Sequence, residues 1–287
     1  MIALSADATD AALVRYGAML AGLGEVAEIR WVHVAAGQPS EPAQVLAGMT
    51  ETVARHFPAQ DSTRFTNCHL LQGDRLDALL EFSTRFQVDL ALLGHRPGRS
   101  PLARRMAMQA PCSVWMVPEG SPCSLKKILI PVDFSRHSAD AVKVATAVAA
   151  LAGVDECQAL HVCFNEAAAT YEEYGETMKE EAEQAFGLFI APIDLHGVNV
   201  KLLVSEGPTA SRTICRIAGE QKSDLIVMST RGRSRSAAIL FGSETEHTMM
   251  ETPVPLLAVK HFGPHVRLLQ ALREDHFLRG RAGPKFS

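Results

Sequence analysis

The feature that most constrains the fold of this chain is an internal repeat. The run IALSAD at 2–7 matches ILIPVD at 128–133, an offset of 126, and His33 matches His161 at an offset of 128. Three later landmarks keep the same order: Gly73 with Gly207, Asp89 with Asp224, and Pro111 with Pro253. The repeat predicts two copies of one domain in tandem, and 287 residues suffice for two hydrophobic cores.

The two copies differ in length near their ends. The offset is 135 at Asp89 and Asp224 and rises to 142 at Pro111 and Pro253, so the first copy lacks seven residues between Asp89 and Pro111. There GRSPLARRMAMQAP leads almost directly into the last apolar run of that copy. We expect the missing segment to be a ligand-binding loop.

The second copy alternates continuous apolar runs with stretches of helical period. Continuous apolar runs are typical of buried parallel strands, and Ser135 is a candidate N-cap for the first helix. The runs are 127–132, 157–162, 200–204, 224–228 and 254–259, and the first two helical stretches are 135–149 and 166–190. The pattern predicts an α/β protein with two tandem, doubly wound, parallel five-stranded sheets, and any ligand at the carboxyl ends of the strands.

The predicted domains are 1–120, 121–263 and a C-terminal tail, 264–287, whose stretch HVRLLQALREDHFL could form an amphipathic helix or a frayed end.

Composition narrows the class of protein. A net charge of −4 gives no electrostatic footprint for nucleic acid. No apolar stretch approaches the roughly 18 residues that span a bilayer, so we expect a cytoplasmic protein without membrane contact. The six cysteines include no C-x-x-C pair, and we expect each to be a small buried hydrophobe.

A candidate phosphate loop follows the fourth strand of the second copy. Ser229-Thr-Arg231-Gly232 is followed by nine residues and then by Gly242-Ser243. Gly232 and Gly242 would permit positive φ and let backbone amides approach phosphate oxygens. The hydroxyls of Ser243 and Thr245 could contact phosphate or a phosphate-held Mg²⁺, and Arg231 could neutralise a polyphosphate. The alternatives are loop punctuation by the glycines and a solvated basic loop.

Three motifs together resemble the universal stress protein family: Pro-Val-Asp-Phe-Ser at 131–135, Leu-His-Val at 160–162 and Gly-x-x-Gly-x9-Gly-Ser, with Ser229 in place of its first glycine. The resemblance is good over 125–260 and faint over 1–118. It implies a Rossmann-like fold that binds ATP or ADP, with Asp133 at the ribose or adenine edge and Val162 lining the adenine slot. If position 229 needs positive φ, Ser229 strains it by about 1 kcal/mol.

Several of these residues have structural alternatives. Asp133 could instead cap the helix that begins near Arg136. His161 and His33 lie in apolar strands and are expected to be satisfied core histidines rather than bases.

The first copy is expected not to bind ATP. Gly94-His95-Arg96-Pro97 stands where the second copy has its loop, and the Gly-Ser is absent, although Asp7 remains as a match for Asp133. We expect the first copy to pack against the second through the final strands, CSVWMV and VPLLAV, which would make a pseudo-dimer within one chain.

Three functions follow as hypotheses. The first is a stress-response regulator that binds ATP or ADP and acts on an unknown protein partner through a changed conformation. The second is an interaction protein without nucleotide, which Ser229 would favour. The third is a slow ATPase, for which Glu244 and Glu246 are the nearby carboxylates but lack a visible orienting group. Association of two chains into a homodimer stays open.

Overall fold

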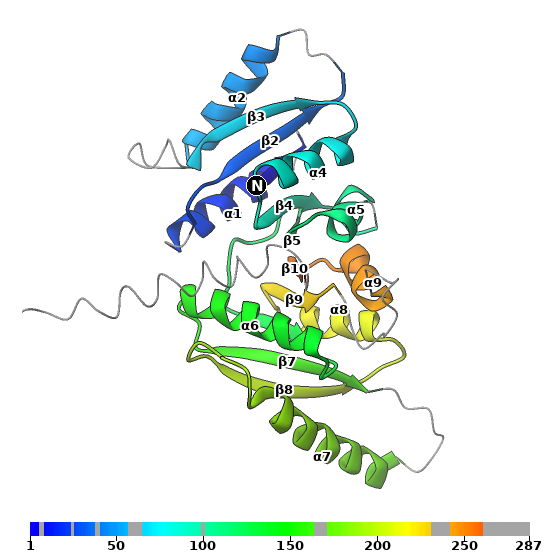
Figure 1. Ribbon diagram of the computed structural model, residues 1–287. Coiled ribbons are helices and arrows are strands. Elements are labelled where there is room, and N and C mark those ends of the chain that lie inside the picture. The colour runs from blue at the N-terminus through cyan, green and yellow to red at the C-terminus, as the bar shows by residue number, and fades with distance from the viewer. Residues whose placement is uncertain are drawn as a thin grey trace, which may run out of the picture.

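The computed structural model describes residues 1–5, 9–23, 26–37, 41–56, 65–98, 101–163, 171–230 and 242–260, with the backbone alone over 171–177. Within these ranges strands and helices alternate along the chain (Figure 1). The first half comprises β1 (Ile2–Leu4), α1 (Asp10–Gly22), β2 (Arg30–Ala35), α2 (Pro42–Ala54), β3 (Asn67–Gln72), α4 (Arg75–Arg85), β4 (Leu90–His95), α5 (Pro101–Gln109) and β5 (Ser113–Pro118). The second comprises β6 (Ile128–Pro131), α6 (Arg136–Leu151), β7 (Glu156–Cys163), α7 (Tyr171–Ile190), β8 (Asn199–Glu206), α8 (Ala210–Glu220), β9 (Leu225–Ser229), α9 (Ser243–Glu251) and β10 (Leu256–Val259).

The strands form one ten-stranded sheet in the order β3-β2-β1-β4-β5-β10-β9-β6-β7-β8. Every pairing is parallel except that of β5 with β10, which is antiparallel and joins the two halves. Each half is therefore a five-stranded parallel sheet of the predicted kind. The predicted pairing of the final strands within one chain is confirmed.

The strand pairing corrects one detail of the repeat. Ile2 lies opposite Trp31, and Ile130 lies opposite Ala159, the counterpart of Trp31 at an offset of 128. Pairing with the neighbouring strand gives the same result. Ile2 lies opposite Leu92, and Leu129, one residue before Ile130, lies opposite Ile226, one residue before the counterpart of Leu92 at an offset of 135. The first strands therefore match at an offset of 128, not 126. Ser5, not Asp7, is the counterpart of Asp133, and Asp7 lies outside the described residues.

The sheet has a helical layer on each face. Apolar side chains of α1, α6 and the end of α2 pack with alternate strand residues in one core, and those of α4, α5, α8 and α9 pack in the other. Figure 1 shows α4, α5, α9 and α8 along the same side of the sheet. The continuous apolar runs are thus explained, because each strand buries both faces.

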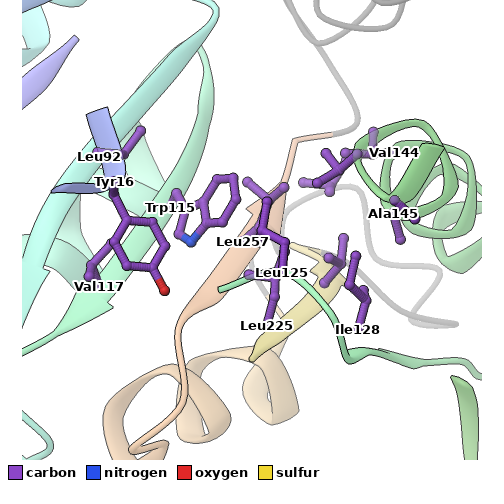
Figure 2. Packing of buried hydrophobic residues seen from close by; sticks show 14 of the residues in the cluster. Tyr16, Leu92, Trp115, Val117, Leu125, Ile128, Val144, Ala145, Leu225 and Leu257 are labelled. Atoms are coloured by element: carbon purple, nitrogen blue, oxygen red, sulfur yellow. The ribbon is translucent and has the colours of Figure 1, made fainter. Parts of the chain in front are cut away.

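The junction between the halves is centred on Trp115 and Leu257. These two residues lie opposite each other in the β5–β10 pair and are structural counterparts at an offset of 142. Both are almost fully buried, at 0% and 1% exposure, and Figure 2 shows them packed between Tyr16 on one side and Val144 on the other. A pseudo-twofold axis therefore passes between Trp115 and Leu257.

Polar contacts also cross this junction. The helices α5 and α9 are counterparts at the same offset, and Arg104 of α5 pairs with its own counterpart, Glu246 of α9, at 2.5 Å. The amide of Gly98 donates to the carbonyl of Met250 at 2.7 Å. Directly after β10, the Nζ of Lys260 donates to the carbonyls of Ala107 and Met108, at the end of α5, at 3.2 and 2.9 Å.

The cysteines follow the prediction only in part. Cys112, Cys157 and Cys163 are buried, and burial raises the pKa of Cys112 to about 11 and that of Cys157 to about 12. Cys68 and Cys215 are half-buried. Cys123 is exposed in the connection between β5 and β6, so the expectation of burial was wrong for this residue.

Candidate functional site

The second half has its topological switch point between β6 and β9. The chain runs outward from β6 through β7 to β8 and then returns to β9 on the other side of β6. In open parallel sheets, ligands bind in the crevice that this reversal leaves at the carboxyl ends of the strands. Asp133 follows β6, and Ser229 ends β9 on the opposite side of the crevice.

Asp133 organises the turn after β6. Its Oδ1 accepts a hydrogen bond from the amide of Ser135 at 3.0 Å. The Oγ of Ser135 accepts from the amide of Ser138 at 3.2 Å, so Ser135 is the N-cap of α6, as predicted. The alternative of Asp133 as the helix cap is wrong in this detail, because Asp133 supports the turn that precedes the cap.

Phe134 has a backbone conformation that was not predicted from the sequence. Its φ is +59°, in the left-handed region that non-glycine residues rarely enter. Its ring stacks on His161 with centroids 4.3 Å apart and an interplanar angle of 21°. The Nδ1 of His161 lies 2.9 Å from the carbonyl of Val132 and donates to it, because a carbonyl can only accept. These contacts fix the turn that presents Asp133.

The histidine contact is repeated in the first half, where the Nδ1 of His33 lies 3.1 Å from the carbonyl of Leu4. Both histidines therefore make the structural hydrogen bond that was predicted, and the expectation that neither acts as a base stays a prediction.

Val162 lies on the opposite face of β7 from His161. Side chains alternate along a strand, and Leu160 and Val162 both pack on the core that holds α8 and α9. Val162 pairs with Ser205 of β8, and β7 continues beside the turn of Asp133, since the amide of Val132 donates to the carbonyl of Leu160 at 2.8 Å. Val162 is partly buried at the carboxyl edge of the sheet.

Ser229 fits its position without backbone strain. It is paired with Val259 in the sheet and is not among the described residues with positive φ. Its counterpart is Gly94, where an added Cβ would clash with the Oγ1 of Thr9. Position 94 is therefore glycine because a larger residue would not fit there, not because the backbone needs a positive φ. The expected strain at Ser229 was wrong.

Gly242 also differs from the expectation. It is the N-cap of α9 with φ −78° and ψ +138°, so it does not use the positive φ that a glycine permits. Its amide donates to the carbonyl of Thr230 at 2.8 Å and therefore closes the loop instead of pointing at a ligand. The first bond of α9 runs from the amide of Glu246 to the carbonyl of Gly242 at 3.0 Å.

Among the described residues, no side chain caps the N-terminus of α9. The amides of Ser243, Glu244 and Thr245 are the first three of the helix, which have no acceptor within it. Ser243 is exposed, and the helix dipole adds a partial positive charge at this end. Three amides with a favourable dipole are suited to an anion such as a phosphate.

Thr245 has a structural role. It is 4% exposed, and its Oγ1 donates to the carbonyl of Ser229 at 2.9 Å, which ties the start of α9 to the end of β9. Its hydroxyl proton is therefore not directed at a phosphate. Arg231 and Gly232 lie outside the described residues.

The two carboxylates near the loop are engaged in contacts between elements. The Oε2 of Glu244 accepts from the amide of Ser211 at 2.7 Å, at the start of α8, and Glu246 pairs with Arg104 of the first half. Both carboxylates therefore hold neighbouring elements together, and a hydrolytic role for them stays a hypothesis.

In the first half, the described residues at the carboxyl ends of β1 and β4 line a cavity of about 20 Å³, with Ser5, Gly94 and Leu102 among them. Ligand pockets measure roughly 300–1,000 Å³. The helix α5 begins at Pro101, the counterpart of Ser243, so one of the amides available in α9 is missing there.

The presence of α5 is itself a correction, because the sequence suggested that this segment led almost directly into the last strand. The seven missing residues precede α5, which has the same nine-residue length as α9. Across the described ranges, no helix is both long and apolar enough to cross a membrane.

Comparison with known proteins agrees with this architecture. The sequence profile of the universal stress protein family matches residues 124–260. A universal stress protein of Methanocaldococcus jannaschii is 33% identical over 141 residues, which cover 47% of this chain and 82% of that protein. One of Synechocystis is 30% identical over 143 residues, covering 49% of this chain and 88% of the relative.

Solved structures extend the likeness in fold to both halves. A putative universal stress protein of Pseudomonas aeruginosa has a TM-score of 0.68 at 18% identity, covering 94% of this chain and 96% of its own. One from Archaeoglobus fulgidus has a TM-score of 0.60 at 16% identity, covering 91% and 96%. From the sequence relatives, together with a fold shared along nearly the whole length, the chain belongs to the universal stress protein family.

Proposed function

We propose that this chain is a stress-response regulator that binds one adenine nucleotide, ATP or ADP, in its second half, residues 121–263. The first half, residues 1–120, holds no nucleotide and serves as the structural partner of the second. Binding acts through a change of conformation that a protein partner senses, and no covalent step is required.

The observation that carries this proposal is the uncapped N-terminus of α9 at the switch point. The phosphates would accept from the amides of Ser243, Glu244 and Thr245, with the Ser243 hydroxyl beside them. Asp133 and Val162 lie at the carboxyl ends of the neighbouring strands, where the ribose and the base would be held. Arg231, Gly232 and a phosphate-held Mg²⁺ would complete the site from the loop.

Ser229 no longer favours the alternative of an interaction protein without nucleotide, because the serine is accommodated in the β9 strand. The ATPase alternative is also weakened, because Glu244 accepts a hydrogen bond from α8 and Glu246 forms an ion pair with α5.

The test is titration calorimetry of ligand-stripped protein with ATP and with ADP. We expect one nucleotide per chain. Asp133→Ala should weaken binding by roughly 10- to 150-fold, the value of a hydrogen bond to a charged group, whereas Ser5→Ala, its counterpart in the first half, should leave binding unchanged.

No binding by a folded protein would refute the proposal. Two nucleotides per chain would refute the assignment to one half. Mass spectrometry of ligand released from freshly purified protein would identify the nucleotide.

A further inference from the structure

A groove lies at the outer edge of the first half, between the edge strand β3 and the helix α4. Its volume is about 460 Å³. The strand β3 has β2 as its only partner in the described sheet, so its other edge is open. This groove is far from the crevice proposed for nucleotide, which lies between β6 and β9 in the other half.

The floor of the groove is largely aromatic and apolar, with the guanidinium of Arg30 over the Phe86 ring at 4.3 Å. The ring of His69 meets Phe82 edge-on with centroids 4.9 Å apart and lies 5.6 Å from Phe86. Leu71 of β3 continues the same surface. The Nε2 of His69 is shielded from solvent and has no hydrogen-bond partner among the described residues. Such a floor favours apolar side chains with an occasional polar group.

The rim of the groove carries the three carboxylates of Asp74, Asp77 and Glu81 and the single guanidinium of Arg85, so its net charge is negative. Asp77 and Glu81 of α4 line it and are exposed, and neither forms an ion pair with a described residue. Asp74 also lines it, although its Oδ1 accepts from the amides of Leu76 and Asp77 and so caps α4. An apolar floor with free carboxylates on its rim is suited to a basic, amphipathic segment.

The matching surface of the second half has the opposite charge. The helices α4 and α8 have eleven residues each and correspond at an offset of 135. Asp77 and Glu81 therefore correspond to Arg212 and Arg216. Arg216 is already paired with Glu220 at 3.0 Å. The exposed carboxylates at these two positions are thus a property of the first half, whose sequence is seven residues shorter before α5.

The chain carries a segment of the complementary kind. Residues 264–287 begin four residues after Lys260, the last described residue, and hold five basic side chains against two acidic ones. The stretch HVRLLQALREDHFL at 265–278 spaces its apolar residues at helical intervals and holds two arginines and both acidic residues, and the other three basic residues follow it at 279–285. As a helix it would be about 21 Å long, at 1.5 Å per residue.

The last described residue, Lys260, contacts a helix on the same face of the sheet as the groove. Its Nζ donates to the carbonyls of Ala107 and Met108 at the end of α5. The helix α5 packs against α4, and both lie on the same core. Neighbouring helices lie about 8–10 Å apart, so the groove beyond α4 is within reach of the residues that follow Lys260.

We propose that residues 264–287 of the same molecule dock in the groove between β3 and α4. The apolar side of 265–278 lies on His69, Phe82 and Phe86, and its arginines face Asp77 and Glu81. The first half would then serve as the docking platform for the tail.

Hydrogen–deuterium exchange of the full chain, read by mass spectrometry on peptides from 264–287, tests this proposal. We expect exchange in the wild type to be slower than in a free peptide of the same sequence. Asp77→Lys/Glu81→Lys should raise the exchange rate of this segment by about fivefold or more, from the loss of two charge pairs and the repulsion that replaces them. Arg212→Glu/Arg216→Glu, at the matching positions of α8, should leave it unchanged.

A charge swap separates docking from a folding defect. Arg267→Glu/Arg273→Glu, added to Asp77→Lys/Glu81→Lys, should restore slow exchange, while thermal unfolding followed by circular dichroism checks that each variant is folded. Exchange at the free-peptide rate in the wild type would overturn the proposal, as would an equal effect of the α8 variant. Protection that is lost on dilution would also overturn it, by assigning the groove to the tail of a second copy.

Discussion

The residue at the start of α9 can be changed to the one that the other half of the molecule has at the matching position. Pro101 stands at the first position of α5, and Ser243 stands at the same position of α9. Ser243→Pro should therefore remove one candidate phosphate donor without breaking the helix, because proline is favoured at the first helical position. The preceding residue is already suited to proline, since Gly242 has φ −78° and ψ +138°.

The magnitude follows from the number of amides. Gly242 donates to Thr230, which leaves the amides of Ser243, Glu244 and Thr245 for a phosphate. One hydrogen bond to a charged acceptor is worth about 1.5–3 kcal/mol, which corresponds to a loss of affinity of roughly 10- to 150-fold. The free energy of unfolding without ligand should change by no more than about 0.5 kcal/mol.

Calorimetric titration with ATP and with ADP measures the first quantity, and urea unfolding measures the second. Ser243→Ala is the control, because it removes the hydroxyl but keeps the amide; the further loss in the proline variant is the contribution of the N–H group. Unchanged affinity in a folded Ser243→Pro protein would show that the phosphates do not bind at the start of α9. Pro101→Ser should create no second site, because the seven-residue deletion before α5 remains.

Three further predictions concern stability. Burial lowers the pKa of His95 from 6.5, so the unfolded state binds a proton more readily than the folded state. The stability that this group contributes is therefore present above about pH 6.5 and falls as the pH drops toward the folded pKa. His95→Gln should flatten that part of the pH dependence of the free energy of unfolding, measured by urea titration at several pH values. Leu257→Ala should cost about 2–5 kcal/mol in chemical denaturation, because it opens a cavity opposite Trp115, and a cost under about 1 kcal/mol would contradict the packing of the junction. Thr245→Val should cost about 1 kcal/mol in the same assay through loss of the bond to Ser229, and no loss would show that this bond is not stabilising.

The sequence predicted the strands and the central pairing, but not the register of the first repeat. Hydrophobic alternation has a period of two, so a shift of two residues keeps every side chain on its own face. Matching Asp7 to Asp133 by identity therefore satisfied the pattern as well as the correct match, Ser5 to Asp133. Only the pairing with the neighbouring strands distinguishes the two.

The loop and helix of each half were harder to predict for a different reason. The sequence could not show which backbone groups are already occupied, such as the Gly242 amide and the Thr245 hydroxyl. It also gave no sign of the positive φ at Phe134, which the stack on His161 and the surrounding aromatic rings accommodate. The helix α5 had a usable signal, since Pro101 is followed by apolar residues at 102 and 106, spaced as on one helical face.

The pseudo-twofold junction makes the two halves non-interchangeable. In a symmetric dimer of either half, each residue on the axis would meet its own duplicate. Two tryptophans at position 115 would be too bulky, two leucines at position 257 would leave a void, and the helices would oppose arginine with arginine or glutamate with glutamate. Only the mixed pairs, Trp115 with Leu257 and Arg104 with Glu246, match in volume and in charge. Each half therefore needs the other to complete the junction, whether or not it binds a ligand of its own.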